Sequence, residues 1–209
     1  PMPRRDEDSH DILGTFKVLS NRAEMMKTPT SPKELFSILS HRHSILLEGR
    51  PHMNPGIFKT KNNRAGMTEF VDYQLVKGTL SQGFKYYAAL TDPFARAIFM
   101  MFMISEVHPF NDGNGRVARV MMNAELVRAD QSRIIVPTVF REDYILALRK
   151  LTQHKDPLAY INVMTKLHQF SDNLYSTDFT ELKNYLATCN AYEEPSQAKL
   201  QIIDRTIIE

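Results

Sequence analysis

Residues 93–119 read PFARAIFMMFMISEVHPFNDGNGRVAR and contain the two features that decide the fold. The first half is apolar on every side when wound as a helix, which predicts a central buried helix from Pro93 to about Glu106. The second half breaks at a turn rich in Gly and Asn, and apolar residues then recur at helical spacing from Val117 to Val127. The sequence therefore predicts two core helices joined by a tight loop.

Segments on both sides of this core also have helical periodicity. Ser31, Pro32 and Glu34 form a capping box with proline at the first position, and the helix that they begin ends at Gly49. Helices are also expected near residues 11–26, where Ile12, Leu13, Phe16 and Leu19 share one stripe, and near 73–89, 141–153, 157–170 and 177–188. Residues 57–71 have few apolar positions between two glycines, which favours a polar loop or hairpin. We predict an all-α fold of about seven or eight helices.

The composition is that of a globular domain. The chain has 209 residues, 43% hydrophobic and 24% charged, and domains are on the order of 100–200 residues long. We expect a disordered N-terminus over residues 1–10, one domain over 11–190, and a tail or helical appendage over 191–209. The first residue is Pro1 rather than Met, so we expect the natural protein to extend further at this end.

Charge and cysteine content exclude several classes of protein. The formal net charge is only +2, too small for a polybasic surface that binds nucleic acid or membranes. The longest apolar run, Ala97–Ile104, is far shorter than the roughly 20 residues that span a bilayer. The single cysteine, Cys189, cannot form an internal disulfide, which predicts a cytoplasmic protein.

The loop between the two core helices has the composition of a phosphate site. Gly113 and Gly115 let backbone N–H groups point into one concavity, and the N-terminus of the next helix adds a partial positive charge. Arg116 and Arg119 lie one turn apart and can clamp phosphate oxygens. The segment is therefore predicted to hold an anion such as phosphate.

Two further side chains add chemistry to this site. Asp112 suits Mg²⁺, which binds through one or two carboxylates together with substrate phosphates. His108, at the entrance of the loop, is placed to remove a proton from an attacking hydroxyl. Each feature alone is more often a helix-end histidine, a plain turn or a solvated arginine pair, but together within twelve residues they indicate a catalytic site.

Residues 108–119, HPFNDGNGRVAR, resemble the signature of the Fic family, His-Pro-Phe-x-Asp/Glu-Gly-Asn-Gly-Arg-x-x-Arg, at every fixed position. The resemblance extends over about residues 12–170, where NPGIFKTKNNRAGMTEFV (54–71) is similar to the family's flap. It implies a Fic-type helical bundle with a short β-hairpin flap next to the active-site loop. It also implies transfer of AMP from ATP, with Mg²⁺, to a Ser, Thr or Tyr hydroxyl of a target protein.

The resemblance also implies roles for individual residues. His108 is the general base, Asp112 binds the metal ion, and phosphates are held by Gly113, Asn114, Gly115, Arg116 and Arg119, with Arg119 on the γ-phosphate. The flap is expected to bind the target's backbone as an added strand through Ile57, Phe58, Lys59, Thr60, Lys61, Asn62 and Asn63. Lys59 stands where many relatives have arginine, which is expected to loosen a flap anchor or an acidic contact. Two alternatives are the same fold acting on another nucleotide or phosphate-containing group, and a non-catalytic regulatory module.

The resemblance raises the question of inhibition. Many Fic proteins are inhibited by a helix with the pattern Ser/Thr-x-x-x-Glu-Gly/Asn, whose glutamate pairs with the last arginine of the signature. Residues 44–49, SILLEG, fit the pattern but lie on the helix that leads into the flap, so we interpret Glu48 as the end of a core helix. We expect the chain to be active as it stands. Inhibition is expected from a helix in a missing N-terminal segment or from a separate antitoxin-like protein.

Overall fold

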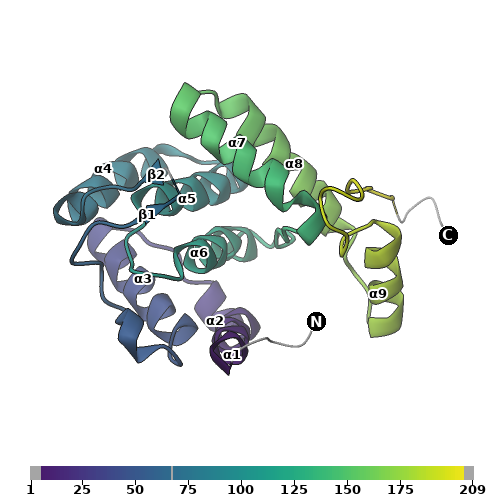
Figure 1. Cartoon of the computed structure of the whole chain (residues 1–209), viewed down its shortest axis with the longest axis horizontal. Helices are drawn as coiled ribbons and strands as arrows, with labels where there is room; N and C mark the ends of the chain where they lie inside the picture. The colour runs from purple at the N-terminus through teal and green to yellow at the C-terminus, as the bar shows by residue number, and fades with distance from the viewer. Residues whose placement is uncertain (1–5, 67, 205–209) are drawn as a thin grey trace. The chain divides into compact units, whose positions relative to one another are not determined.

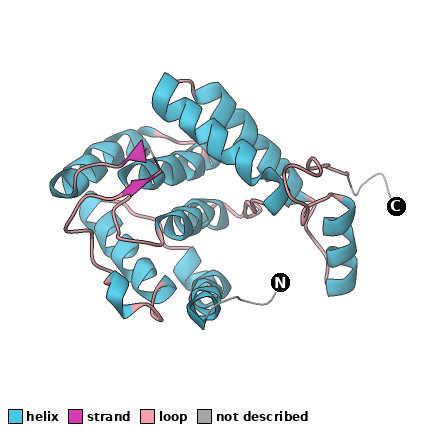
Figure 2. Ribbon diagram, in the orientation of Figure 1, coloured by secondary structure: helices cyan, strands magenta, loops and turns pink. Residues whose placement is uncertain are grey.

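The computed structural model describes residues 6–66 and 68–204 (Figure 1). The chain divides into two compact units, residues 1–131 and 132–209. The single domain that the sequence predicts over 11–190 would span both units and stays a prediction. Within the described residues, nine α-helices and one two-stranded antiparallel sheet make up the regular structure besides three short 3₁₀ turns (Figure 2). The predicted all-α class with a short hairpin is confirmed.

The first unit contains six of these helices, and the predicted start and stop signals account for their ends. They are α1 (Asp6–Ser20), α2 (Arg22–Met25), α3 (Pro32–Leu46), α4 (Val76–Ala89), α5 (Pro93–Val107) and α6 (Asn114–Arg128). The Asp92 side chain accepts a hydrogen bond from the Ala95 backbone N–H at 2.7 Å and caps α5. The Ser31 hydroxyl accepts from the Glu34 N–H at 3.2 Å, but the Glu34 carboxylate accepts from Thr30 rather than from the Ser31 backbone. The predicted capping box is therefore only half formed.

Helices α5 and α6 pack against each other and form the core of the first unit. The predicted central helix α5 buries Met100, Met101 and Ile104 completely. Helix α6 is enclosed even more fully, because every residue from Val120 to Val127 is buried. Its polar residue Glu125 is 4% exposed and accepts hydrogen bonds from the Tyr87 hydroxyl and from Arg96. The core is thus a helix pair rather than a single central helix.

Helix α1 packs through a different face from the predicted apolar stripe. Ile12, Leu13 and Phe16 are 59%, 56% and 65% exposed, whereas Asp11, Gly14 and Val18 are buried. A side chain at Gly14 would lie 2.4 Å from the Ile45 carbonyl oxygen of α3, so only glycine allows the two helices to approach this closely. The helix begins at Asp6, so residues 6–10 are helical where disorder is expected, and residues 1–5 lie outside the described residues.

The hairpin follows the segment that the sequence analysis identifies as the docking edge. Strands β1 (Arg64–Ala65) and β2 (Thr68–Glu69) pair antiparallel, with Arg64 opposite Glu69 and Ala65 opposite Thr68. Residues 57–63 precede the strands as an irregular stretch, and the 3₁₀ turns Pro51–Met53 and Tyr73–Leu75 flank the whole flap. The predicted loop or hairpin at 57–71 is therefore confirmed as a combination of both.

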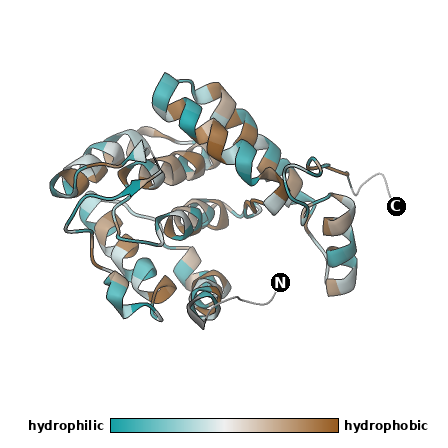
Figure 3. Cartoon of the chain, viewed as in Figure 1, coloured by the Kyte–Doolittle hydropathy of each residue, from teal (hydrophilic) through white to brown (hydrophobic). Residues whose placement is uncertain are grey.

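The second unit contains α7 (Arg141–His154), α8 (Pro157–Asp172) and α9 (Phe179–Thr188), with a 3₁₀ turn at Thr138–Phe140. Helices α7 and α8 pack on each other, and hydrophobic residues alternate with hydrophilic ones along them (Figure 3). The tail from Ala191 to Asp204 is irregular rather than helical. It is attached by the Tyr185 hydroxyl, which donates to the Ile203 carbonyl oxygen, while its last residues, 205–209, lie outside the described part.

The helices of both units are short. In the described part of the chain, no helix has the length and apolar character needed to cross a membrane. Cys189 is a buried free thiol at the end of α9.

Candidate active site

The loop between α5 and α6 is shaped by two residues with positive φ. His108 ends α5 in the left-handed conformation (φ 49°), and its N–H donates to the Ile104 carbonyl oxygen at 2.9 Å. This conformation costs a non-glycine residue about 1–2 kcal/mol, and such strain is concentrated at functional sites. Gly113 (φ 74°) begins α6, and a Cβ atom there would lie 3.2 Å from Leu47 and 3.4 Å from His43. The Gly113 end of the turn is thus held against α3.

The start of α6 offers the predicted anion-binding groups. The Gly113 carbonyl oxygen accepts the first helical hydrogen bond, from Val117, so the backbone N–H groups of residues 114–116 precede the helical ladder. The Asn114 side chain is 2% exposed and bonds both the N–H and the C=O of Phe110, at 2.9 and 2.8 Å. Asn114 therefore closes the loop with its side chain and has only its backbone N–H to offer to an anion.

His108 has the protonation pattern of a general base. Its Nδ1 lies 3.1 Å from the Ser105 carbonyl oxygen, which can only accept, so Nδ1 carries the proton and Nε2 is the basic nitrogen. Burial lowers the pKa of His108 below its ordinary value and thus favours the neutral ring. Phe70 stacks on the imidazole with ring centres 3.6 Å apart and planes 5° apart. The flap thereby fixes the plane of the histidine ring.

A cluster of charged side chains surrounds Arg116. Its guanidinium pairs with the Asp11 carboxylate of α1, and lies 3.6 Å from Asp112 Oδ2. Arg50 pairs with Asp11 at 2.5 Å, with Asp8 at 3.4 Å and with Asp112 at 3.5 Å. Three carboxylates thus share two guanidinium groups, and Arg116 is paired with protein carboxylates in this structure.

Asp112 meets the requirements of a magnesium ligand only in part. Its side chain is 40% exposed, and Oδ1 accepts from the Gly113 N–H at 2.7 Å while Oδ2 faces the two arginines. No group of three or more His, Cys, Asp or Glu residues in the described part could hold a metal ion. A single accessible carboxylate fits an ion that arrives with a nucleotide and takes its other ligands from phosphates and water. It does not fit a site built entirely from protein.

The flap is anchored to the active-site loop by backbone and side-chain contacts. The Lys59 N–H donates to the Pro109 carbonyl oxygen at 2.8 Å, and its ammonium donates to Asn63 Oδ1 and toward the Val107 carbonyl oxygen at the end of α5. Lys59 is 3% exposed, and burial lowers its pKa. The Asn63 amide donates to the Phe110 carbonyl oxygen at 2.8 Å. Lysine therefore anchors the flap, where the sequence analysis expects a looser anchor.

The structure also places three further residues that the sequence singles out. Arg119 lies one turn into α6, and a side chain at Gly115 would come within 3.4 Å of its guanidinium, so glycine leaves that arginine room. Ile57 is 59% exposed on the flap, and its role in docking stays a prediction. Glu48 lies just beyond the end of α3, is 68% exposed and pairs with Lys17 of α1. It is therefore a surface residue next to a core helix.

Several residues of the site carry no signal that the sequence analysis could use. Asp11 meets Arg50 and Arg116 only through the packing of α1 and the turn after α3. Phe70 reaches the loop because the flap folds back over it, and Asn63, predicted only to contact the target, also bonds to the loop through Phe110. The sequence offers one indication of the contact with Asp11. The spacing of Asp11, Gly14 and Val18 places the carboxylate on the same helix face as a glycine, which allows a neighbouring helix to approach closely.

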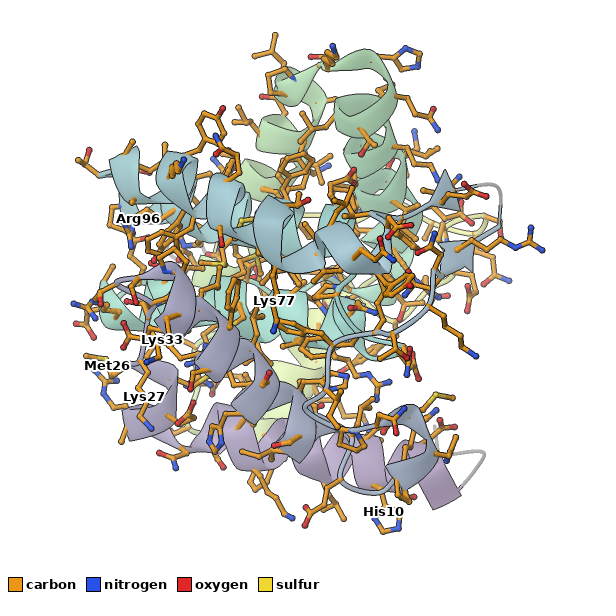
Figure 4. All side chains as sticks on the ribbon, turned by 90° about the vertical axis from the view of Figure 1, so that its left-hand side faces the viewer. His10, Met26, Lys27, Lys33, Lys77 and Arg96 are labelled. Atoms are coloured by element: carbon orange, nitrogen blue, oxygen red, sulfur yellow. The ribbon has the colours of Figure 1, made fainter. Side chains whose placement is uncertain are left out.

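The cavities of the first unit lie on several of its faces. One of about 540 Å³ is lined by Tyr87, Arg96 and Glu125, at the start of α5, about 20 Å along that helix from His108. Figure 4 shows Arg96 far from His10 of α1. A second cavity of about 590 Å³ lies between α3 and flap residues 56–59. The predicted base and phosphate-binding residues lie at the loop between α5 and α6 and do not line the cavity of about 540 Å³.

The sequence matches known proteins over its central part. Residues 35–126 match the model of the Fic/DOC family. Protein adenylyltransferase fic-1 of Caenorhabditis briggsae is 39% identical over 57 residues, which cover 27% of this chain and 11% of that protein. A probable protein adenylyltransferase of Aquifex aeolicus is 34% identical over 103 residues, 49% of this chain and 30% of that protein. The chain spans less than a third of the length of either relative.

Solved structures show the same fold over most of the chain. Residues 134–508 of Fic-1 from Caenorhabditis elegans align with a TM-score of 0.66 at 17% identity, covering 91% of this chain and 54% of that one. A Fic domain containing signaling protein from Bacteroides thetaiotaomicron aligns with a TM-score of 0.62 at 16% identity, covering 90% of this chain and 70% of that one. The family model, the curated relatives and the solved structures agree: residues 35–126 are similar to the domain of the Fic/DOC family, and the fold is that of Fic proteins.

Proposed function

We propose that this protein transfers AMP from ATP to the hydroxyl group of a Ser, Thr or Tyr side chain on a target protein. The observation that carries the proposal is the position of His108 beside the N-terminus of α6, with Nδ1 bound to Ser105 and Nε2 basic. A fixed base next to an anion-binding helix start is the arrangement that phosphoryl chemistry on a hydroxyl requires. Relatives named adenylyltransferases support AMP as the group transferred.

The reaction follows from these groups. His108 Nε2 accepts the proton of the target hydroxyl as its oxygen attacks the α-phosphorus, a P–O bond forms, and the P–O bond to the β-phosphate breaks. Pyrophosphate leaves with that bond's electrons. The N–H groups of Asn114 and Gly115 and the side chains of Arg116 and Arg119 stabilise the phosphate charge, and the N–H of Gly113 joins them where it exchanges its bond to Asp112 for a phosphate oxygen. When bound, Mg²⁺ neutralises charge on the phosphates, and Asp112 is the residue that would hold it.

The target is proposed to bind along flap residues 57–63. Lys59 and Asn63 fix this stretch to the loop, while Ile57 is exposed and available for contact. An extended segment of the target lying beside the flap would bring its hydroxyl toward His108. A cytoplasmic target is proposed on the same grounds as the cytoplasmic location, namely the single cysteine of the chain.

Incubation with radiolabelled ATP, Mg²⁺ and a cell lysate tests the function. We expect label from the α-phosphate, but not from the γ-phosphate, to become attached to protein. Parallel incubations with UTP, GTP and CTP, each labelled on the α-phosphate, identify the preferred base. Transfer from another nucleotide alone would establish the alternative donor, and absence of transfer from all four would favour a non-catalytic module.

The pairing of Asp11 with Arg116 leads to a prediction about nucleotide affinity. ATP must share or replace the carboxylate contacts of Arg116, so Asp11→Asn is expected to tighten ATP binding about three- to tenfold, since it removes one competing negative charge. Isothermal titration with ATP and Mg²⁺ measures this.

Asp8→Asn is the matched control, because Asp8 pairs only with Arg50 among the contacts described above and is 43% exposed. Its effect is expected to stay below about twofold. Weaker ATP binding in Asp11→Asn would show instead that Asp11 orients Arg116 for the phosphates.

A further inference from the structure

His43 lies in the last turn of α3, between the flap and the active-site loop. It is completely buried, and both of its ring nitrogens are bonded to backbone groups. Nδ1 lies 2.9 Å from the Gly56 nitrogen, in the turn that opens the flap. Nε2 lies 2.9 Å from the Asp112 carbonyl oxygen. One side chain thus joins two segments that are far apart in the sequence.

The two contacts fix the tautomer of the ring. The Gly56 N–H can only donate, so Nδ1 must be the acceptor, and the Asp112 carbonyl can only accept, so Nε2 must carry the proton. Only a neutral imidazole with its proton on Nε2 satisfies both groups. This is the opposite tautomer from that of His108, whose Nδ1 carries the proton. His43 is therefore arranged as a connector and not as a base.

Packing holds the ring in the plane that these hydrogen bonds need. Phe110 stacks on His43 with ring centres 3.7 Å apart and planes 4° apart, and Phe58 of the flap packs on Phe110 at 5.2 Å. Gly113 approaches so closely that a Cβ atom there would lie 3.4 Å from His43 Nε2. The ring thus fixes both the carbonyl of Asp112 and the glycine that begins α6.

From this geometry we infer that His43 is a positioning residue that holds the Asp112–Gly113 turn, and with it the anion-binding N–H groups, in register with the flap. The inference deepens the proposed function and rests on it for the part that concerns ATP. The two hydrogen bonds themselves are independent of any ligand. His43 acts through Asp112 and Gly113 and does not contact the nucleotide.

Three substitutions separate the two hydrogen bonds from the packing. His43→Phe keeps the aromatic stack and removes both bonds. His43→Asn places an amide oxygen near the position of Nδ1 and retains the bond to Gly56. His43→Gln places an amide nitrogen near the position of Nε2 and retains the bond to Asp112. His41→Ala is the control, because His41 is on the same helix with its side chain 56% exposed.

Hydrogen exchange read by mass spectrometry reports the connection directly, in peptides that cover residues 54–58 and 109–116. We expect His43→Phe to speed exchange in both peptides about tenfold or more, His43→Asn only in 109–116, and His43→Gln only in 54–58. Equal changes in both peptides for all three variants would show that His43 merely stabilises the core. Unchanged exchange in His43→Phe would overturn the inference.

ATP affinity connects the inference to the proposed function. Titration with ATP and Mg²⁺ is expected to show about tenfold weaker binding in His43→Phe and His43→Asn, and binding within about threefold of wild type in His43→Gln. If ATP affinity instead follows the melting temperature of the variants, the positioning role is wrong. If the wild-type protein binds no ATP, the proposed function fails, while the exchange pattern still decides the role of His43.

Discussion

His108→Ala is expected to lower the rate of AMP transfer at saturating ATP by about 10²–10⁴-fold, the usual contribution of a general base. ATP affinity is expected to stay within about threefold of wild type, because the anion-binding N–H groups and arginines lie beyond the loop, on α6. The turn at the end of α5 should keep its shape, since the backbone N–H of residue 108 still bonds to the Ile104 carbonyl oxygen. Single-turnover transfer and ATP titration measure the two quantities separately.

His41→Ala serves again as the matched control and is expected to behave as wild type, because His41 is exposed on α3. A parallel loss of ATP affinity and transfer in His108→Ala would show that His108 shapes the site rather than acting as the base. The pH profile adds an independent check. Burial lowers the pKa of His108, so the neutral base persists as pH falls past its ordinary value of about 6.5, and the acid limb of transfer should lie below that value.

Local signals in the sequence predict most of the chain's helices and the position of the tight loop between the two core helices. The cap at Asp92, the apolar run after it and the break at His108 are each decided by residues a few positions apart. The glycines of the loop work in the same way, because Gly113 adopts a positive φ that its neighbours in sequence already suggest. Such features need no knowledge of the rest of the fold.

Long-range packing decides what the sequence could not predict. Helical periodicity in α1 is equally compatible with a buried stripe of Ile12 and Phe16 or with the observed face of Asp11, Gly14 and Val18. The choice depends on how closely α1 approaches α3, and the contact of Gly14 with the Ile45 carbonyl settles it. The same packing brings Asp11 to Arg116, so the electrostatic surroundings of the signature arginine come from the far end of the chain.

The hydrogen bonds of His43 are a second case of this kind. In the sequence, His41 and His43 are two histidines on a helix, and their spacing argues only against a shared metal ion. Tertiary structure distinguishes them, since the His41 side chain is 56% exposed and lies 3.8 Å from Glu24, whereas His43 is buried between two backbone segments. A sequence therefore indicates what a residue does only where the residues near it in the chain also determine its surroundings.

Asp112→Asn is expected to raise the Mg²⁺ concentration needed for half-maximal ATP binding about tenfold or more, and to lower transfer at about 1 mM Mg²⁺ roughly 10²-fold. The substitution removes the charge but keeps an oxygen that can still accept from the Gly113 N–H, so the turn retains its shape. Calorimetric titration of ATP at several Mg²⁺ concentrations measures the effect without relying on catalysis.

The change in ATP affinity expected without Mg²⁺ distinguishes metal binding by Asp112 from a structural role. In the presence of EDTA, loss of the carboxylate removes repulsion toward the phosphates, so Asp112→Asn should bind ATP as tightly as wild type or a few-fold more tightly. Asp130→Asn is the matched control for charge, because Asp130 is 89% exposed and pairs with Arg22. If Asp112→Asn weakens ATP binding equally with and without Mg²⁺, Asp112 acts by holding Arg50 and Arg116 rather than by binding the metal ion.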